Sequence, residues 1–261
     1  MSGWITQLGE RFMSFLHYAG GITVLAVRTV FWTFVPPFKR KPVLEQMVKV
    51  GIDSLPIVFL TCLFTGMVLA LQSAYQMQKM EAKLYIASLV ALSLTRELGP
   101  VLTALVVAGR VGASIAAELG TMKVTEQIDA LETLATNPVK YLVVPRFIAL
   151  FFMLPLLTIY GDIVGILGGY MIGVWRLNIL SNLYWDMTWN PLKVKDIVTG
   201  LIKSFAFAIV ICIVACYEGM RVEGGAEGVG AATTKAVVIS FILIIAADCL
   251  FTALFYFGFS F

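Results

Sequence analysis

Long apolar stretches alternate with short polar segments along most of this chain. A helix needs about 20 mainly apolar residues to cross ~30 Å of hydrocarbon, and five stretches meet that length. They cover about residues 54–74, 85–117, 145–174, 197–217 and 236–257. This pattern predicts an all-α polytopic membrane protein with five transmembrane helices in one domain, which extends over residues 38–261.

The first 37 residues show a different pattern. Apolar residues recur there at helical spacing among polar ones, at Trp4, Ile5, Leu8, Phe12, Phe15 and Leu16. Arg28 interrupts the apolar residues 18–35 that follow, and Pro36 and Pro37 end them. Helices of this kind lie in the plane of the membrane interface. We therefore predict an interfacial elbow over residues 1–37, with a sixth span as the alternative.

Lys and Arg residues are distributed unevenly between the two sides that five spans define. With the amino terminus inside, twelve of the 19 fall on the inner side and seven on the outer side. Because basic residues collect in cytoplasmic loops, this bias favours an amino terminus at the cytoplasmic face. The net charge of +3 adds only a mild attraction to anionic lipid.

The second stretch carries ionisable residues at membrane depth. At ~100° per residue along an α-helix, five polar side chains fall within about 80° of one another. They are Arg96, Thr103, Arg110, Ser114 and Glu118. Ionisable groups inside a membrane are costly and normally face a bundle interior or a water-filled cavity. The stripe predicts a helix that lines the path of a polar or amphiphilic cargo.

Two further charges lie deep in the last two stretches. Lys203 is about a third of the way into residues 197–217, and Asp248 lies near the middle of residues 236–257. Together these two residues can form an ion pair. Such a pair either fixes the packing of two helices or takes part in gripping a cargo head group or relaying motion.

The segment after the second stretch is amphipathic. Within residues 121–136, apolar side chains occupy one face, at Val124, Ile128, Leu131 and Ala135, and Asn137 with Pro138 ends the helix. A short cytoplasmic helix of this kind suits docking to a soluble partner. A solvated connector on the membrane surface is the alternative.

Two other segments carry packing signals. Residues 177–191 contain Tyr184, Trp185 and Trp189, which predicts a short helix at the outer interface. The third stretch contains three consecutive GxxxG steps, at Gly161, Gly165, Gly169 and Gly173. Such ridges allow helix backbones to approach closely. They serve either packing within one chain or the seam of a homodimer.

Composition and motifs argue for transport rather than catalysis. Hydrophobic residues make up 59% of the 261 residues and charged residues only 13%. The four cysteines lie within apolar stretches and fit small buried hydrophobes, with no cluster of metal ligands, and the single histidine, His17, lies in the amphipathic start. Nucleophile-elbow, zinc-protease and phosphate-loop motifs are absent from the sequence. If transport consumes ATP, another chain must hydrolyse it.

Several long segments resemble the permease subunit of MlaE-type ABC transporters. The central one reads LSLTRELGPVLTALVVAGRVGASIAAELGTMKVTEQIDAL, and NPVKYLVVPR follows it. GLIKSFAFA around Lys203 and AADCLFTALF around Asp248 extend the resemblance over nearly the whole chain. Members of this family are lipid-asymmetry transporters of Gram-negative inner membranes, akin to the lipid importer permease of chloroplast envelopes.

The resemblance implies an assembly and a cargo. It implies a multi-pass homodimer in the bacterial inner membrane, with two ATPase subunits on the cytoplasmic side that hold ATP and Mg²⁺. This chain itself would need no cofactor. A hexameric MCE-domain protein lies on the periplasmic side, and many members have a small STAS-domain protein. The implied cargo is phospholipid, held in an outward-facing cavity at the dimer interface, and no nucleic acid is involved.

The matching positions give a set of candidate site residues. A phospholipid presents an anionic phosphate and two apolar chains, which an arginine and an apolar lining can bind. The candidate lipid-binding residues are Arg96, Glu97, Leu98, Val68 and Leu69. The functional intramembrane charges are Lys203 and Asp248. Coupling to the ATPase falls to Glu118, Glu126, Gln127, Ile128, Asp129 and Leu131.

Two other classes of function compete with this one. An ion- or proton-coupled secondary transporter would use Lys203 and Asp248 as a relay. A membrane scaffold would transport nothing. The amphipathic cytoplasmic helix at residues 121–136 favours an ATP-driven permease, since a proton-driven carrier needs no docking helix.

Overall fold

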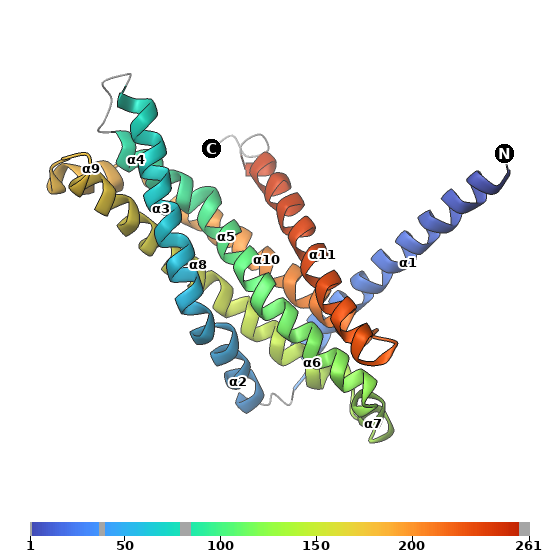
Figure 1. Ribbon diagram of the computed structural model, residues 1–261. Coiled ribbons are helices and arrows are strands. Elements are labelled where there is room, and N and C mark those ends of the chain that lie inside the picture. Colours follow the sequence, from blue (N-terminus) through green and yellow to red (C-terminus); the bar gives the residue numbers. More distant parts are fainter. Residues whose placement is uncertain (1, 37–39, 79–84, 256–261) are drawn as a thin grey trace.

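The computed structural model describes residues 2–36, 40–78 and 85–255, and the chain there is helical almost throughout (Figure 1). In chain order the elements are α1 (Ser2–Thr33), α2 (Arg40–Val50), η1 (Ile52–Ser54), α3 (Leu55–Gln78), α4 (Tyr85–Ser93), η2 (Leu94–Leu98), α5 (Gly99–Val107), η3 (Ala108–Gly112), α6 (Ala113–Val124), α7 (Gln127–Thr133), η4 (Val139–Val143), α8 (Val144–Trp175), α9 (Ser181–Trp189), α10 (Val194–Met220) and α11 (Gly225–Ala253). The described residues contain no strand, so the predicted all-α fold is confirmed.

Each predicted span lies within a helix or a run of helices. The second span is built from α4, η2, α5, η3 and α6, in which η2 and η3 are π-helical turns. The last span differs most from the prediction, because α11 begins at Gly225, eleven residues before position 236. Positions 256 and 257 of that predicted span lie outside the described residues. Six helical segments of the described chain, α1 included, are long and apolar enough to cross a membrane.

Helix α1 runs across the direction of α3 and α8, and its amino-terminal half extends away from the bundle (Figure 1). Leu25 and Thr29 are buried against the bundle, whereas Phe12 is 61% exposed. The predicted apolar side chains at Trp4, Ile5, Leu8 and Phe15 lie outside those that the structure describes. The crossing direction supports the interfacial elbow, which stays a prediction because length and composition also permit a sixth span.

The glycine ridge of α8 packs within the chain. A Cβ atom on Gly66 of α3 would lie 1.8 Å from the carbonyl oxygen of Gly165, and one on Gly168 would lie 2.3 Å from that of Leu63. Gly161 lies against Cys62 and Gly173 against the ring of Tyr184. Of the two interpretations of the GxxxG steps, packing within one chain is therefore the one that the structure supports.

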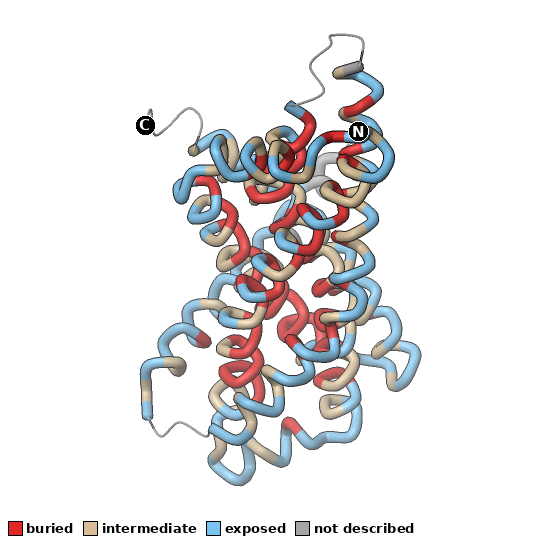
Figure 2. The backbone as a smooth tube through the Cα atoms, turned by 90° about the vertical axis from the view of Figure 1, so that its left-hand side faces the viewer, coloured by how far each residue is buried: buried red, intermediate tan, exposed pale blue. Residues whose placement is uncertain are grey.

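Buried residues run through the middle of the bundle, while the helix ends are exposed (Figure 2). The larger apolar core joins α5, α6, α8 and α10, and a smaller one joins α3, α4 and α9. Residues 181–189 form the short helix α9, in which Tyr184 is almost fully buried in the smaller core, while the location of this helix at the outer interface stays a prediction. Trp189 is 59% exposed, as an outer-interface residue would be. Cys249 is exposed, unlike Cys62, Cys212 and Cys216, and it departs from the expected burial.

Candidate functional site

The second span changes its helical geometry where its first charges lie. Leu94–Leu98 forms a π-helical turn, which carries Arg96 and Glu97. Pro100 follows in the first turn of α5 and has no N–H group to donate to the preceding turn. Single π turns inside α-helices are frequent at functional sites. The local sequence therefore widens the helix at the position of its first two charges.

Lys203 is the centre of a buried charge network. Its side chain on α10 is 2% exposed, and its ammonium group donates to Oε2 of Glu97 at 2.5 Å and to Oγ1 of Thr252 at 2.8 Å. Oδ1 of Asp248 lies 2.9 Å from the same nitrogen. The Thr252 hydroxyl donates to Glu97 at 3.1 Å. One cation thus holds two carboxylates, and the network joins η2, α10 and α11.

The predicted pair of Lys203 and Asp248 is present, but sequence reasoning missed two of its neighbours. Glu97 was assigned to the lipid together with Arg96, whereas its carboxylate is bound by Lys203. Thr252 was not singled out. Its position four residues after Asp248, one helical turn further along the same face, was the available signal.

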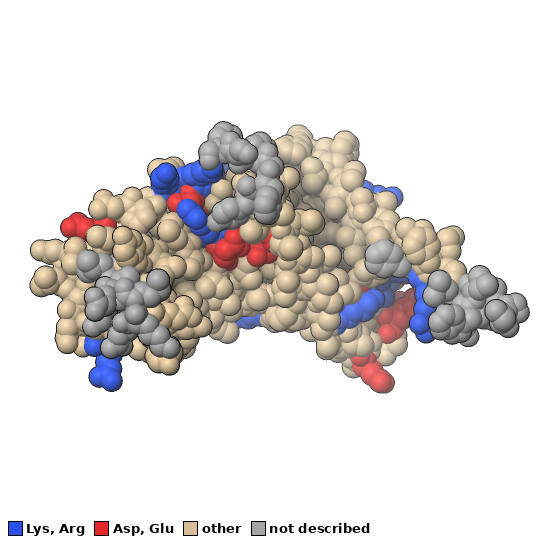
Figure 3. Space-filling view, turned by 90° about the horizontal axis from the view of Figure 1, so that it is seen from above, with Lys and Arg blue, Asp and Glu red and all other residues tan. Residues whose placement is uncertain are grey.

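Arg96 has a different partner. Its Nε donates to Oδ1 of Asp196 at 2.8 Å, and the other carboxylate oxygen of Asp196 accepts the backbone N–H of Lys193 at 3.0 Å. Asp196 therefore both caps the start of α10 and fixes Arg96, whose side chain is 34% exposed. In Figure 3, Lys and Arg side chains gather beside Asp and Glu side chains at this end of the molecule. The acidic residue in the first helical turn of LKVKD was the signal for Asp196.

The predicted apolar lining divides into two parts. Leu69 and Leu98 pack against the smaller apolar core, next to the π turn. Val68 is 57% exposed, because it lies about 100° around α3 from Leu69. The structure therefore packs Leu69 and Leu98 against the same apolar core, with Leu98 in the π turn of Arg96 and Glu97, and it leaves Val68 on the outer surface of this chain.

The single polar stripe predicted for the second span is wrong. Arg110, Ser114 and Glu118 line one cavity of about 210 Å³ near α2. Thr103 is instead buried, and Arg96 pairs with α10. Arg96 lies in the first π turn, η2, and Arg110 lies in the second π turn, η3. Each π turn takes up extra residues, so positions that share a face in a regular α-helix are rotated apart.

The inner polar residues hold helices together. Glu118 accepts from Lys49 of α2 and from Arg146 of α8, each at 3.0 Å. Arg110 donates to Oγ of Ser54 at 3.2 Å. Glu118 lies in α6, before α7, where it packs α2 and α8 against α6, and its assignment to ATPase coupling stays a prediction.

The predicted coupling segment forms α7, but its apolar face points inward. Ile128 is 5% exposed, and Leu131 packs beside it against the larger core. The chain reverses at Glu126, which has a φ of 58°, and this turn folds α7 back onto α6. The assignment of Ile128 as a docking residue is therefore corrected, whereas Leu131 is only partly buried and its assignment stays a prediction. The exposed candidates are Glu126, Gln127 and Asp129, together with Val124 (40%) and Leu134 (74%).

Comparison with known proteins gives the family. The family described as Permease MlaE matches residues 43–254. A probable ABC transporter permease protein of Rickettsia felis is 47% identical over 250 residues, which cover 96% of each chain. The intermembrane phospholipid transport system permease protein MlaE of Haemophilus influenzae is 39% identical over 218 residues, or 83% of this chain and 84% of that protein.

A chloroplast protein is also similar. Protein TRIGALACTOSYLDIACYLGLYCEROL 1 of Arabidopsis thaliana is 39% identical over 215 residues, which cover 82% of this chain and 61% of that protein. The matched family region contains α3 to α11 and all the charges of the Lys203 network. This multi-pass membrane protein belongs to the MlaE family of ABC transporter permeases.

Proposed function

We propose that this chain is the permease subunit of a transporter that moves phospholipids between the bacterial inner membrane and a periplasmic MCE-domain carrier. The observation that carries the proposal is the arrangement around η2. Arg96, whose side chain is about one-third exposed, shares this π turn with the apolar Leu98 and with Glu97, which the buried Lys203 binds. The name of the Haemophilus influenzae relative, a phospholipid transport permease, supports the same cargo.

Arg96 suits the phosphate of such a cargo. A guanidinium group can bind two phosphate oxygens at once, and Nε of Arg96 is held by Asp196. A phosphate that approaches must share the guanidinium group with Asp196 or displace its carboxylate. The acyl chains would then lie against Leu69 and Leu98. Glu97 cannot serve the lipid freely in this state, since Lys203 and Thr252 bind its carboxylate.

The Lys203 network suits a role in the transport cycle. It connects the π turn that carries Arg96 to α10 and α11, so movement of either helix changes the environment of the cargo arginine. Buried ionic groups of this kind stabilise a structure only while every partner is in place. We infer that the network holds one state of the cycle and is broken in another.

An ABC transporter permease requires ATPase subunits. We propose that two ATPase chains bind at the α7 end of a homodimer, with the hexameric MCE-domain protein at the opposite end and a STAS-domain protein beside the ATPase. The exposed residue Leu134 follows α7 directly and offers an apolar contact, whereas Ile128 is used in the chain's own core.

The Leu134 contact has a direct test. Leu134→Asp should abolish association with the ATPase and leave the thermal stability of the permease unchanged. Ile128→Asp should lower the stability itself, because it buries a charge in the core. Co-purification and thermal unfolding of both variants check this. Normal ATPase association in Leu134→Asp would reject the assignment.

A secondary transporter driven by protons or ions remains the second candidate, and one observation favours it. The Lys203 ammonium group is surrounded by two carboxylates, of Glu97 and Asp248, and one more proton can be accommodated there. Transport in proteoliposomes separates the two mechanisms. An ABC permease requires the ATPase and ATP, whereas a secondary transporter responds to a pH or ion gradient without them.

The cargo assignment is tested at position 96. Arg96→Glu should sharply reduce the phospholipid recovered with the purified complex, because it replaces attraction to phosphate with like-charge repulsion. Arg176→Glu is the matched control, since Arg176 is an exposed arginine that follows α8. A photo-crosslinker at position 96 should label phospholipid. Normal lipid occupancy in Arg96→Glu, together with no crosslink from position 96, would remove Arg96 from the site.

A further inference from the structure

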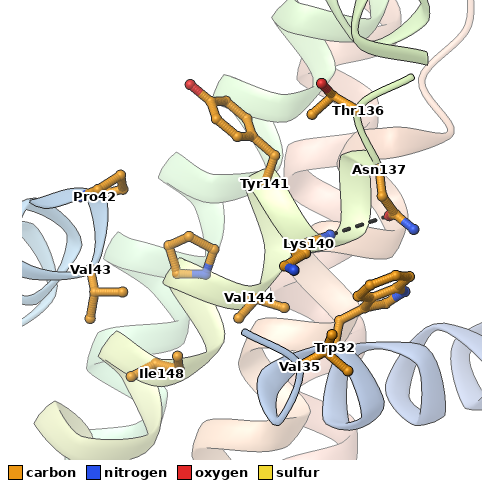
Figure 4. A pocket seen from close by; sticks show the side chains of 11 residues that line it. Trp32, Val35, Pro42, Val43, Thr136, Asn137, Lys140, Tyr141, Val144 and Ile148 are labelled. Carbon is orange, nitrogen blue, oxygen red and sulfur yellow. Dashed lines mark hydrogen bonds between the residues drawn. The ribbon is translucent and has the colours of Figure 1, made fainter. Parts of the chain in front are cut away.

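A small cavity lies far from Arg96, at the α7 end of the molecule. It has a volume of about 140 Å³ and is enclosed by the end of α1, the start of α2 and the start of α8. Figure 4 shows that Val43 comes from α2, Val144 and Ile148 from α8, and Trp32 from α1. These side chains make most of its wall apolar. The cavity is therefore suited to a hydrocarbon group.

One cation marks the polar edge of this cavity. Nζ of Lys140 donates to the carbonyl oxygen of Pro36 at 3.0 Å and lies 5.2 Å from the ring centre of Trp32. The backbone N–H of Lys140 donates to Oδ1 of Asn137 at 3.3 Å (dashed in Figure 4). No carboxylate of the described residues forms an ion pair with Lys140. An ammonium group has three donors, and an anion can use those that remain.

The surroundings of the cavity are typical of a membrane interface. Phe34 is 77% exposed and Leu44 is 61% exposed, one on each side of the connection between α1 and α2. Trp32 and Tyr141 contribute aromatic rings to the cavity wall, and such rings are enriched at the level of lipid head groups. These surroundings suit a ligand that enters from a membrane interface.

The acidic groups nearest to this cavity do not line it. Asp129 and Glu132 line a neighbouring cavity of about 570 Å³, which shares Trp32, Thr136 and Asn137 with the first. Asp129 is paired with Lys123 at 2.7 Å, and Arg28 lines that second cavity as well. Lys140 is therefore the charged side chain that lines the first cavity among the described residues.

We propose that this cavity binds one anionic phospholipid of the cytoplasmic leaflet, with its phosphate on Lys140 and part of an acyl chain between Val43 and Ile148. The inference rests on the proposed placement of the α7 end at the cytoplasmic face. It does not depend on Arg96 or on the identity of the cargo. Such a lipid contacts α1, α2 and η4 together, directly after α7, and ties the elbow to the segment that meets the ATPase.

Photo-crosslinking of the complete transporter in nanodiscs tests this site. A benzoylphenylalanine at position 43 lies in the cavity, and one at Phe152, which is 53% exposed on α8, serves as an outside control. The probe is an alkyne-labelled phosphatidylglycerol, compared with a phosphatidylcholine of the same acyl chains. Position 43 should prefer phosphatidylglycerol by about fivefold or more, the order that one lysine contributes near an anionic lipid. Position 152 should show no preference.

Substitutions connect the preference to Lys140. Lys140→Glu should abolish the preference at position 43 and Lys140→Arg should keep it. Lys41→Glu makes the same change in net charge at an exposed lysine that does not line the cavity, and it should have no effect. Ile148→Trp should fill the cavity and lower crosslinking of both lipids.

Three outcomes would overturn the proposal. One is an equal preference at positions 43 and 152, and another is an equal loss in Lys41→Glu and Lys140→Glu, since both indicate general attraction to the surface. The third is competition by soluble inorganic phosphate, which would indicate a site for the free anion. Arg96→Glu should leave crosslinking at position 43 unchanged, so failure of the cargo proposal is distinguished from failure of this one.

Discussion

The two groups of intramembrane charge in this chain are built in opposite ways. Around Lys203, one cation that is 2% exposed serves two carboxylates. Around Glu118, one carboxylate that is 34% exposed serves two cations, Lys49 and Arg146. The carboxylates of both groups are partly exposed, at 33% for Glu97, 22% for Asp248 and 34% for Glu118, but the first group has an excess of negative charge and the second an excess of positive charge. Burial of Lys203 makes the first group sensitive to the loss of its cation, whereas the 57% exposure of Lys49 makes the second tolerant of the loss of this lysine.

The strongest test of this comparison is to remove Lys203, the cation that the two carboxylates of the first group share. Lys203→Met should be the most damaging single substitution, because it leaves the partly buried carboxylates of Glu97 and Asp248 without their shared cation. Their partial exposure should keep the loss below the about 3–5 kcal/mol expected for a fully buried pair. Thermal unfolding of the purified permease in one fixed detergent measures the loss. The triple variant that also carries Glu97→Gln and Asp248→Asn should recover part of it. If the triple variant is less stable than Lys203→Met, the network is not electrostatic in origin.

Removal of Asp248 alone should cost less. Asp248→Asn leaves the contacts of Lys203 with Glu97 and Thr252 in place, so a matched pair remains in the core. We expect a loss well below that of Lys203→Met in the same unfolding assay. Transport should nevertheless fall if Asp248 links α11 to the cycle. Equal losses of stability for the two substitutions would show that Glu97 does not share the charge of Lys203.

The group around Glu118 should respond more weakly. Arg146→Met removes a nearly buried cation from Glu118, but Lys49 remains bound to the same carboxylate. Lys49→Ala should have the smallest effect, about 0–1 kcal/mol, because the lysine side chain is 57% exposed. Its effect should also shrink further at high salt. A loss for Lys49→Ala as large as that for Lys203→Met would end the distinction between the two groups.

The sequence predicted the spans well because membrane thickness alone sets their length. The deep position of Lys203 and Asp248 was also enough to predict their pairing, since a membrane offers few other partners to a charge. The π turns at η2 and η3 could not be read from periodicity, because they change the period itself. Because of this change, Arg96 lies off the predicted stripe and pairs with Asp196.

The sequence also did not allow us to predict the direction in which the apolar face of α7 points. Ile128 and Leu131 lie on an apolar face, but a face does not specify whether its partner is another protein or the same chain. The left-handed turn at Glu126 decided this by folding the helix inward, and a glutamate does not favour that conformation. The glycines of α8 likewise did not specify whether they pack within the chain or against a second copy, and the backbone contact between Gly66 and Gly165 shows that they pack within the chain.

That backbone contact also constrains how the molecule can move. At the point where Gly66 meets Gly165, the backbones of α3 and α8 touch with no side chain between them, so no rotamer change there can make room for sliding. Packed backbones have one close fit, and we therefore expect α3 and α8 to move as one rigid unit. Helix movements in a transport cycle are then expected at α10 and α11, which Lys203 joins to each other and to η2.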